Sequence, residues 1–272
     1  MPRLFMCPPD FFTIAYEINP WMRRSVRSIS RLAHDQWWDL FQLLTEKLGC
    51  TVELLRPQEG LPDLVFTANA GIVWGRTFVP SRFRYRERRG EEKHYRRYFE
   101  ARNYQVVDLE GEDPFEGAGD ALLCGEDIFF GYHFRSEFPA HEALSRLLGK
   151  RVLPLMLTDP RFYHLDTCFC PLWGGEAIFF PAAFDSYGRA VLEDYFPPEK
   201  RYAVPEEEAL RFACNAVALP EHVILPSGCP RTARRIRKWG YEVHQVRLSE
   251  FMKSGGSAKC LTLLLDEDKK AG

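Results

Sequence analysis

The sequence has little of what marks a secreted, membrane-spanning or nucleic-acid-binding protein. Over its 272 residues no apolar run approaches the length of a membrane helix, and the first residues lack the apolar core of a signal peptide. Its 36 basic and 38 acidic residues nearly balance, which leaves no basic footprint for nucleic acid or for a membrane surface. We therefore expect a cytoplasmic protein that has neither nucleic acid nor a membrane as a partner.

The eight cysteines are scattered along the chain and are not grouped in repeated C-x-x-C pairs. Thiols without metal-ligand spacing indicate neither a zinc site nor a disulfide framework, and they fit a reducing cytosol. The one close pair, Cys168 and Cys170, falls on a predicted strand, where alternate neighbours face opposite sides. We expect no metal and no cofactor.

A pattern recurs along the chain at intervals of about 48 residues. Each unit reads as a polar residue among small ones, an apolar strand, a turn, a second strand, a helix and a third strand. The leading polar residues are Asn69, Asp120, Asp166, Asn215 and Cys260. Units of this size cannot bury a face alone, and radial packing around an axis would solve that problem.

The repeat therefore predicts one α/β domain over residues 1–272, a closed arrangement of five blades. The first strand of each unit would lie nearest the axis, and its leading residue would point into a shared cavity. The alternative is an ordinary α/β sheet with coincidental spacing.

Helices are predicted between the repeated strands, at 31–48, 91–102, 140–148, 186–195 and 231–239. Three of them run through a glycine into a strand. Gly49, Gly149 and Gly240 would each stop a helix by adopting the left-handed conformation.

The stretch 254–260 carries the strongest candidate for chemistry, Cys260. Two glycines let the backbone turn tightly or approach a ligand, and Lys259 beside the thiol would favour the reactive thiolate. The apolar run 260–265 predicts a buried strand, which places the thiol where a loop enters a sheet. The alternative is an inert, buried cysteine.

Two further groups of polar residues precede apolar strands. Glu116 and Asp120 flank small residues in F-E-G-A-G-D, a pattern that also fits a tight turn. His164 and Asp166 lie two apart, on one face of a predicted strand, where a histidine is often structural. With Cys260, these residues supply a nucleophile, a general acid/base, an orienting carboxylate and further carboxylates for a cation.

These motifs resemble the guanidino-group-modifying enzymes of the pentein superfamily, which includes arginine deiminase and dimethylarginine dimethylaminohydrolase. The chain is most similar to the arginine dihydrolases, found alone or in front of an ornithine cyclodeaminase half. The stretches that carry the resemblance are 6–10, 18–22, 62–71, 162–170 and 258–263. The resemblance implies a five-bladed ββαβ propeller with pseudo-fivefold symmetry. Because the sequence ends at Gly272, we expect no cyclodeaminase half.

The resemblance also implies catalytic roles for Cys260, His164, Glu116 and Asn69, and a substrate-binding role for Asn19. Cys260 would attack the guanidinium carbon, and His164 would protonate the departing ammonia and then activate water. Glu116 would orient His164. Asn69 and Asn19 would distinguish a dihydrolase from the deiminases by supporting a second hydrolysis before product leaves.

Five more residues are implied in substrate binding. Asp120 and Asp166 would hold the guanidinium, with Asp63 as a further contact. Arg88, in a basic run that otherwise reads as a solvated loop, and Arg135 would grip the substrate carboxylate. Paired hydrogen bonds between planar guanidinium and carboxylate groups suit both contacts.

The resemblance implies an enzyme that converts arginine to ornithine, ammonia and carbon dioxide. Dimethylarginine hydrolysis and simple deimination to citrulline are the enzymatic alternatives, the latter weakened because Lys259 stands where many deiminases have histidine. The fold also hosts a non-enzymatic ribosome-associated factor, which would lack the thiol and carboxylates. The sequence leaves open whether the chain forms a homo-oligomer.

Overall fold

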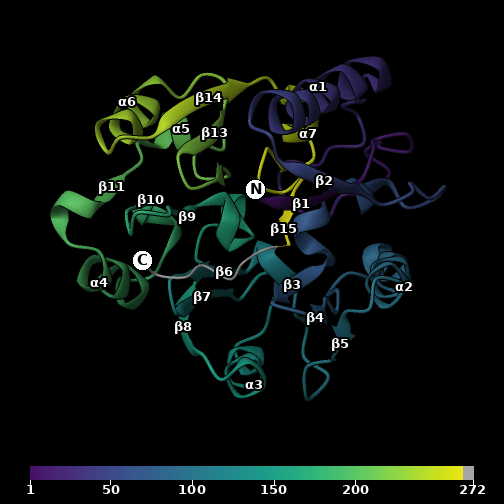
Figure 1. The fold of residues 1–272 in the computed structure, drawn as a ribbon, viewed down its shortest axis with the longest axis horizontal. Helices are drawn as coiled ribbons and strands as arrows, with labels where there is room; N and C mark the ends of the chain where they lie inside the picture. Colours follow the sequence, from purple (N-terminus) through teal and green to yellow (C-terminus); the bar gives the residue numbers. More distant parts are fainter. Residues whose placement is uncertain (266–272) are drawn as a thin grey trace.

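The computed structural model describes residues 1–265 and arranges five three-stranded sheets around a central axis. Figure 1 looks along this axis and shows the sheets as five sectors, with α1, α2, α3, α4 and α6 on the outside. The predicted α/β propeller of five blades is therefore confirmed.

The bounds of the elements follow the predicted repeat. The strands are β1 (Arg3–Met6), β2 (Thr51–Leu54), β3 (Gly71–Trp74), β4 (Thr77–Pro80), β5 (Gln105–Val106), β6 (Ala121–Cys124), β7 (Asp127–Tyr132), β8 (Arg151–Met156), β9 (Phe169–Pro171), β10 (Ala177–Phe179), β11 (Arg201–Ala203), β12 (Val217–Ala218), β13 (His222–Pro226), β14 (Glu242–Val246) and β15 (Leu263–Leu264). The α-helices are α1 (Ser30–Gln42), α2 (Arg86–Glu100), α3 (Pro139–Leu148), α4 (Ser186–Tyr195), α5 (Glu206–Ala209), α6 (Pro230–Lys238) and α7 (Ser249–Met252).

Each sheet combines an antiparallel hairpin with a parallel third strand. In the sheet β6-β7-β8, β7 is antiparallel to β6 and parallel to β8, and α3 connects β7 to β8. One sheet instead joins the two ends of the described chain, because β15 pairs with β1 through Leu4 opposite Leu264. This pairing closes the ring.

The helices end where the glycines predicted. α1 buries Ala33, Trp37 and Leu40 on one face and continues as a π-helical turn to Lys47. Gly49 follows with a φ of 67°, and Gly149 and Gly240 have φ values of 62° and 98°. These left-handed residues end the helices and turn the chain into the parallel strand of each blade.

Two predicted elements differ from the structure. α2 begins at Arg86 and not at residue 91, so the basic run is partly helical. Its first turns bury Arg88 against Glu91, a polar contact that a search for apolar periodicity cannot detect. The strand predicted at 260–265 is limited to β15, because residues before it form a turn in which Thr262 N–H donates to the carbonyl of Lys259.

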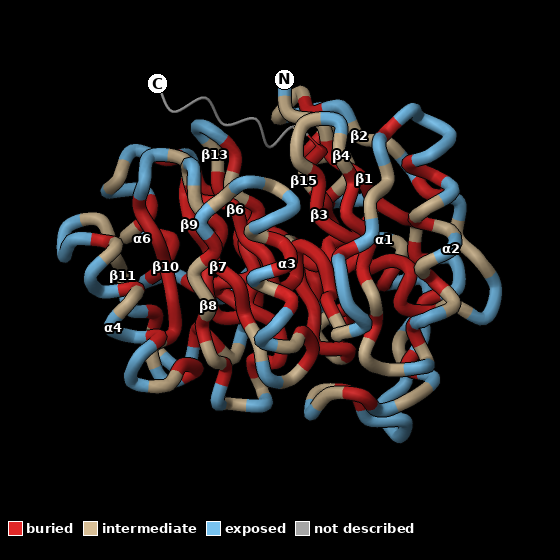
Figure 2. Tube along the Cα trace, turned by 90° about the horizontal axis from the view of Figure 1, so that it is seen from below, coloured by how far each residue is buried: buried red, intermediate tan, exposed pale blue. Residues whose placement is uncertain are grey.

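The leading polar residues of the five units lie in short turns immediately before the innermost strands. Asn69 and Asp166 lie in 3₁₀ turns at Thr67–Ala70 and Leu165–Thr167. His164 precedes the second of these turns, so the prediction that it shares a strand face with Asp166 was wrong. The turns nevertheless bring distant segments to the axis, where Figure 2 shows mostly buried chain. Within residues 1–265, no helix is long and apolar enough to cross a membrane.

Two glycines with the same backbone conformation provide a test of close packing at the axis. Gly117 and Gly125 both have a φ of 59°, but a Cβ at Gly117 would lie 2.7 Å from the backbone of Gly71. A Cβ at Gly125 would meet nothing within 4 Å. We expect Gly125→Ala to cost about 1 kcal/mol in unfolding free energy.

The Gly117→Ala variant should cost about 3 kcal/mol, because strain and overpacking add. Urea denaturation of both variants measures the difference. Equal losses would contradict the close approach of the two blades.

Candidate active site

The thiol of Cys260 is buried and lies in a network built by Asn215. The side-chain amide of Asn215 donates to Cys260 Sγ at 3.0 Å, and its oxygen accepts the backbone N–H groups of Ser257 and Cys260 at 3.0 and 3.1 Å. The thiol itself donates to Asp166 Oδ2 at 3.4 Å. Asn215 therefore fixes both the turn that carries the thiol and the thiol itself.

The electrostatics of Cys260 differ from the expectation. Burial raises the pKa of the Cys260 thiol well above its ordinary value, and the carboxylate of Asp166 raises it further. Lys259 lines a different cavity with Leu4 and Cys214, and its Nζ has no hydrogen-bond partner among residues 1–265. The thiol is therefore held protonated when no cation lies beside it.

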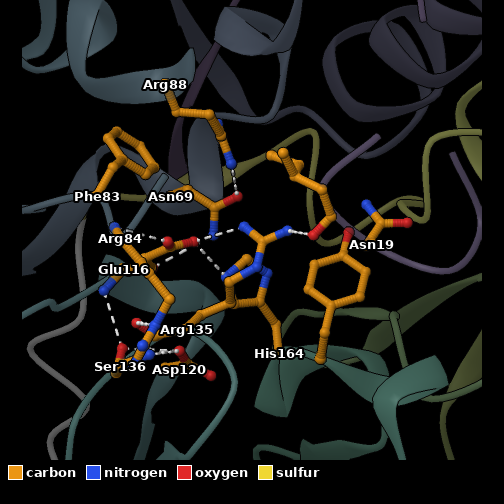
Figure 3. Close-up of polar contacts among 12 residues, drawn as sticks. Asn19, Asn69, Phe83, Arg84, Arg88, Glu116, Asp120, Arg135, Ser136 and His164 are labelled. Carbon is orange, nitrogen blue, oxygen red and sulfur yellow. Dashed lines mark hydrogen bonds and ion pairs between the residues drawn. The ribbon is translucent and has the colours of Figure 1, made fainter. Parts of the chain in front are cut away.

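A second network holds the imidazole of His164. His164 Nε2 lies 2.7 Å from Glu116 Oε2, and Arg135 Nη1 donates to the same oxygen at 3.0 Å. Figure 3 shows one carboxylate oxygen of Glu116 in contact with both side chains. Burial alone would raise the pKa of Glu116, but Arg135 and His164 outweigh it and hold that pKa well below its usual range. Glu116 is thus an anion that fixes the orientation of His164.

Asp120, the other predicted contact for a guanidinium, is held by hydrogen bonds from within the protein. Its Oδ2 accepts hydrogen bonds from the backbone N–H and the hydroxyl of Ser136, and its Oδ1 accepts from the backbone N–H of Leu165. Both oxygens are engaged by the protein, so Asp120 joins the Ser136 loop to the turn after His164. Its burial raises the pKa of Asp120 to about 6.

Asn69 and Arg88 are hydrogen-bonded to each other and lie above Glu116 in the view of Figure 3. Arg88 Nη1 donates to Asn69 Oδ1 at 2.8 Å, and Asn69 Nδ2 donates to the carbonyl of Glu116 at 3.3 Å. Arg88 also forms two 2.8 Å hydrogen bonds with Glu91 and donates to the carbonyl of Asp63. The amide of Asn69 is therefore fixed at both ends.

Two buried carboxylates keep an unsatisfied oxygen. Asp63 Oδ1 and Asp166 Oδ1 have no hydrogen-bond partner among residues 1–265. Burial raises the pKa of Asp63, and it raises the pKa of Asp166 to about 7. Unpaired buried acceptors are costly, which makes these oxygens natural partners for a cationic donor.

Asn19 belongs to a loop that covers these groups. Its amide donates to the carbonyl of Ser254 at 3.0 Å, and its oxygen accepts the backbone N–H groups of Trp21 and Met22. The indole of Trp21 donates to the carbonyl of Arg161 at 2.7 Å. These contacts hold the loop over the segment that leads to Cys260.

Six of the predicted residues line one small cavity with a volume of about 10 Å³. They are Asn19, Asp63, Asn69, Arg88, Arg135 and Cys260. Glu116 and Asp166 are hydrogen-bonded to two of these lining residues, Arg135 and Cys260, and His164 contacts Glu116.

Sequence reasoning missed three contributors to this site. Asn215 occupied a leading position of the repeat but received no role, and the repeat itself was the signal. Tyr163, whose ring lies 4.6 Å from the guanidinium carbon of Arg135, sits beside the predicted His164. The carbonyl of Ile18, which accepts from Arg135 at 3.0 Å, carries no side-chain signal at all.

The geometry defines a class of protein that combines a buried, hydrogen-bonded cysteine with an imidazole–carboxylate pair inside a five-bladed propeller. The family model described as N,N dimethylarginine dimethylhydrolase, eukaryotic, matches residues 13–265. The chain therefore belongs to this family.

Two relatives and one solved structure show which members of this family the chain resembles. The bifunctional arginine dihydrolase/ornithine cyclodeaminase AgrE of Nostoc sp. is 47% identical over 97% of this chain, which spans 38% of that protein. The N(G),N(G)-dimethylarginine dimethylaminohydrolase of Mycobacterium tuberculosis is 39% identical, with 96% of this chain and 85% of that protein covered. The N-terminal domain of ArgZ, solved with a covalently bound reaction intermediate, is 44% identical with a TM-score of 0.94, and 98% of each chain is covered.

The role of Asn215 can be tested through the reactivity of the thiol. In Asn215→Asp, the donor to Cys260 Sγ is replaced by an oxygen, and the added negative charge disfavours the thiolate. We expect alkylation of Cys260 by iodoacetamide to slow about tenfold, the effect of one pKa unit. Mass spectrometry of the Cys260 peptide gives the rate. The exposed Asn103→Asp variant is the matched control, and equal rates in all three proteins would contradict this role.

The raised pKa of Asp166 predicts a pH-dependent stability. A carboxyl with a pKa of about 7 in the folded protein binds its proton more tightly than in the unfolded chain. Its contribution is complete at low pH and is lost as pH rises toward 7. The midpoint of thermal unfolding of the wild type, relative to Asp166→Asn, should therefore fall between about pH 4 and about pH 8.

The exposed Asp194→Asn variant serves as the control, and its midpoint should follow that of the wild type at every pH. A constant difference between wild type and Asp166→Asn would show that Asp166 titrates normally.

Proposed function

We propose that this protein hydrolyses guanidino C–N bonds through a covalent intermediate on Cys260, and that its substrate is L-arginine. The observation that carries this proposal is the pair of unsatisfied carboxylate oxygens, Asp63 Oδ1 and Asp166 Oδ1, beside a buried thiol. A guanidinium is a planar cation with several N–H donors and would satisfy both acceptors. The covalent intermediate in ArgZ and the dihydrolase name of AgrE support the same chemistry.

The raised pKa of Cys260 gives the substrate an electrostatic part in the reaction. A guanidinium held by Asp63 and Asp166 would bring positive charge beside the sulfur and favour the thiolate. The thiolate then attacks the guanidinium carbon, and His164, oriented by Glu116, transfers a proton to the departing ammonia. Water activated by His164 hydrolyses the amidino-thioether and regenerates the thiol.

A dihydrolase repeats this cycle on the bound ureido product. The overall reaction consumes arginine and two waters and yields ornithine, two ammonia molecules and carbon dioxide. We assign Asn69 and Asn19 to the second hydrolysis. The position of the two residues supports this assignment, since both line the cavity and both are held by hydrogen bonds to neighbouring segments.

Arg135 is the better placed of the two arginines to bind the substrate carboxylate. It uses one N–H on Glu116 and one on the carbonyl of Ile18, and an arginine side chain has five. Most of the N–H groups of Arg88 already donate hydrogen bonds to Glu91, Asn69 and Asp63. We therefore propose that Arg135 provides the main contact and that Arg88 adds one donor while fixing Asn69.

The loop that contains Asn19 must move for arginine to bind. A cavity of about 10 Å³ is close to the space that a single water needs. The hydrogen bond of Asn19 to Ser254 and that of Trp21 to Arg161 are the contacts that would have to break.

We also propose that residues 1–272 form a single catalytic domain in a cytoplasmic setting, with residues 266–272 outside the described part. The eight free thiols support a reducing compartment.

The second candidate function is hydrolysis of methylated arginine to citrulline and dimethylamine. The family match and the 39% identical relative from Mycobacterium tuberculosis favour it. The two activities differ in substrate and in the number of hydrolyses, but both would use Cys260.

A product assay distinguishes these activities. With L-arginine the protein should release ornithine without accumulating free citrulline, as measured by mass spectrometry. Cys260→Ser should lower turnover by at least about 10³-fold, since the nucleophile is lost, and still bind arginine. Cys50→Ser is the matched control and should retain activity, since Cys50 is buried but does not line the cavity.

Three outcomes would change the assignment. Accumulation of citrulline from arginine indicates a deiminase, and release of dimethylamine from dimethylarginine in preference to attack on arginine indicates the second candidate function. Retained activity in Cys260→Ser would remove the covalent mechanism.

A further inference from the structure

A second group of polar side chains lies on the blade formed by β12, β13 and β14. His222 on β13 is in register with Glu242 on β14, and His244 follows Glu242 by two residues. Side chains two apart share one face of a strand, so the parallel pairing places all three on the same face. Figure 1 shows β13 and β14 side by side, with α6 nearby.

The three side chains present their ligand atoms to one another at short distances. His222 Nδ1 lies 3.4 Å from His244 Nε2, which lies 3.4 Å from a carboxylate oxygen of Glu242. The other oxygen of Glu242 lies 3.7 Å from His222 Nδ1. All the possible donor atoms of this group lie within 4.8 Å of one another.

These separations match the edges of a metal coordination polyhedron. With zinc–nitrogen bonds of about 2.0 to 2.1 Å, two ligands at the tetrahedral angle are about 3.4 Å apart. Two imidazoles and one carboxylate are a ligand set that zinc uses in proteins. Imidazole also suits other late transition ions but not magnesium or calcium.

We propose that His222, Glu242 and His244 form a binding site for a divalent transition-metal ion. Zn²⁺ is the reference ion for this site. His222 and Glu242 also line a surface cavity of about 620 Å³ that includes Trp173 and Tyr241. The ion is reached from this side, and its remaining coordination position faces the cavity. A water or a small external ligand completes the site there.

Lys47 competes with the metal for this site. Its Nζ lies 3.3 Å from His244 Nδ1 and 3.7 Å from Glu242. When Nδ1 accepts a hydrogen bond from Lys47, the neutral imidazole carries its proton on Nε2, and Nε2 cannot be a ligand. Metal binding therefore requires Lys47 to withdraw. The side chain of Lys47 is 60% exposed and can do so.

The site is separate from the candidate active site. None of its three ligands lines the cavity that contains Cys260. The proposal therefore stands whether or not the protein acts on arginine. Since Cys260 and His164 could themselves bind zinc, the test is made in a Cys260→Ser background.

Calorimetric titration with ZnCl₂ tests the site on the full chain. In the Cys260→Ser protein we expect one ion to bind, and we expect His222→Asn and Glu242→Gln to weaken binding by at least about tenfold. The Lys47→Met change should instead strengthen binding by about tenfold, since both the competing proton donor and a repelling charge are removed.

The visible absorption of bound cobalt(II) is a second measurement, and it would not change if the three residues had only a structural role. Bound Co²⁺ should show the visible absorption of low-coordinate cobalt, and His222→Asn should abolish it while circular dichroism stays unchanged. Wild-type affinity in His222→Asn and Glu242→Gln would overturn the proposal, as would weaker binding in Lys47→Met.

Discussion

The structure depends on the pairing of β15 with β1. Ring closure requires the C-terminal strand to complete a sheet begun by the first strand of the chain, through Leu4 opposite Leu264. Cys260 lies three residues before β15, so the contact that closes the propeller also places the thiol at the axis. The turn before β15 has little other regular structure to hold it, and Asn215 supplies the hydrogen bonds that such a turn lacks. The strand pairing that closes the fold therefore also positions Cys260.

Charge is distributed unequally among the buried acids around the axis. Glu116 is compensated by Arg135 and His164, which keep it ionised despite burial. Asp63 and Asp166 are compensated only in part, by the charges of Arg88 and Lys259 respectively, so burial still raises their pKa values, and each retains an unpaired oxygen. A protein interior does not maintain such acceptors without cost, which is offset when a ligand provides the missing donors. The guanidinium of the proposed substrate is a cation with such donors.

The repeat of polar residues predicted the fold because each one leads the innermost strand of a blade. The same repeat located Asn69, Asp166 and Cys260 near the axis, and it included Asn215 without indicating that an amide would support the thiol. The sequence could not distinguish Asp120 from Asp166. The hydrogen bonds that satisfy the Asp120 carboxylate come from the hydroxyl and backbone N–H of Ser136. Residues such as these require coordinates because their partners are backbone groups from distant loops.

The start of α2 shows the same limit for secondary structure. The first turns of α2 are buried through the ion pair between Arg88 and Glu91 and not through apolar contact. The sequence therefore predicted the start of this helix at residue 91, whereas α2 begins at Arg86. The orientation of Lys259 could not be predicted either, since a neighbour in sequence can face a different cavity.

The hydrogen bond from Asn19 to the carbonyl of Ser254 joins two distant parts of the chain. Ser254 begins the segment that carries Cys260, so the loop that contains Asn19 is attached directly to that segment. Any movement of the loop would therefore remove one support of the segment. The conformations of the loop and of the turn around Cys260 are coupled through this single contact.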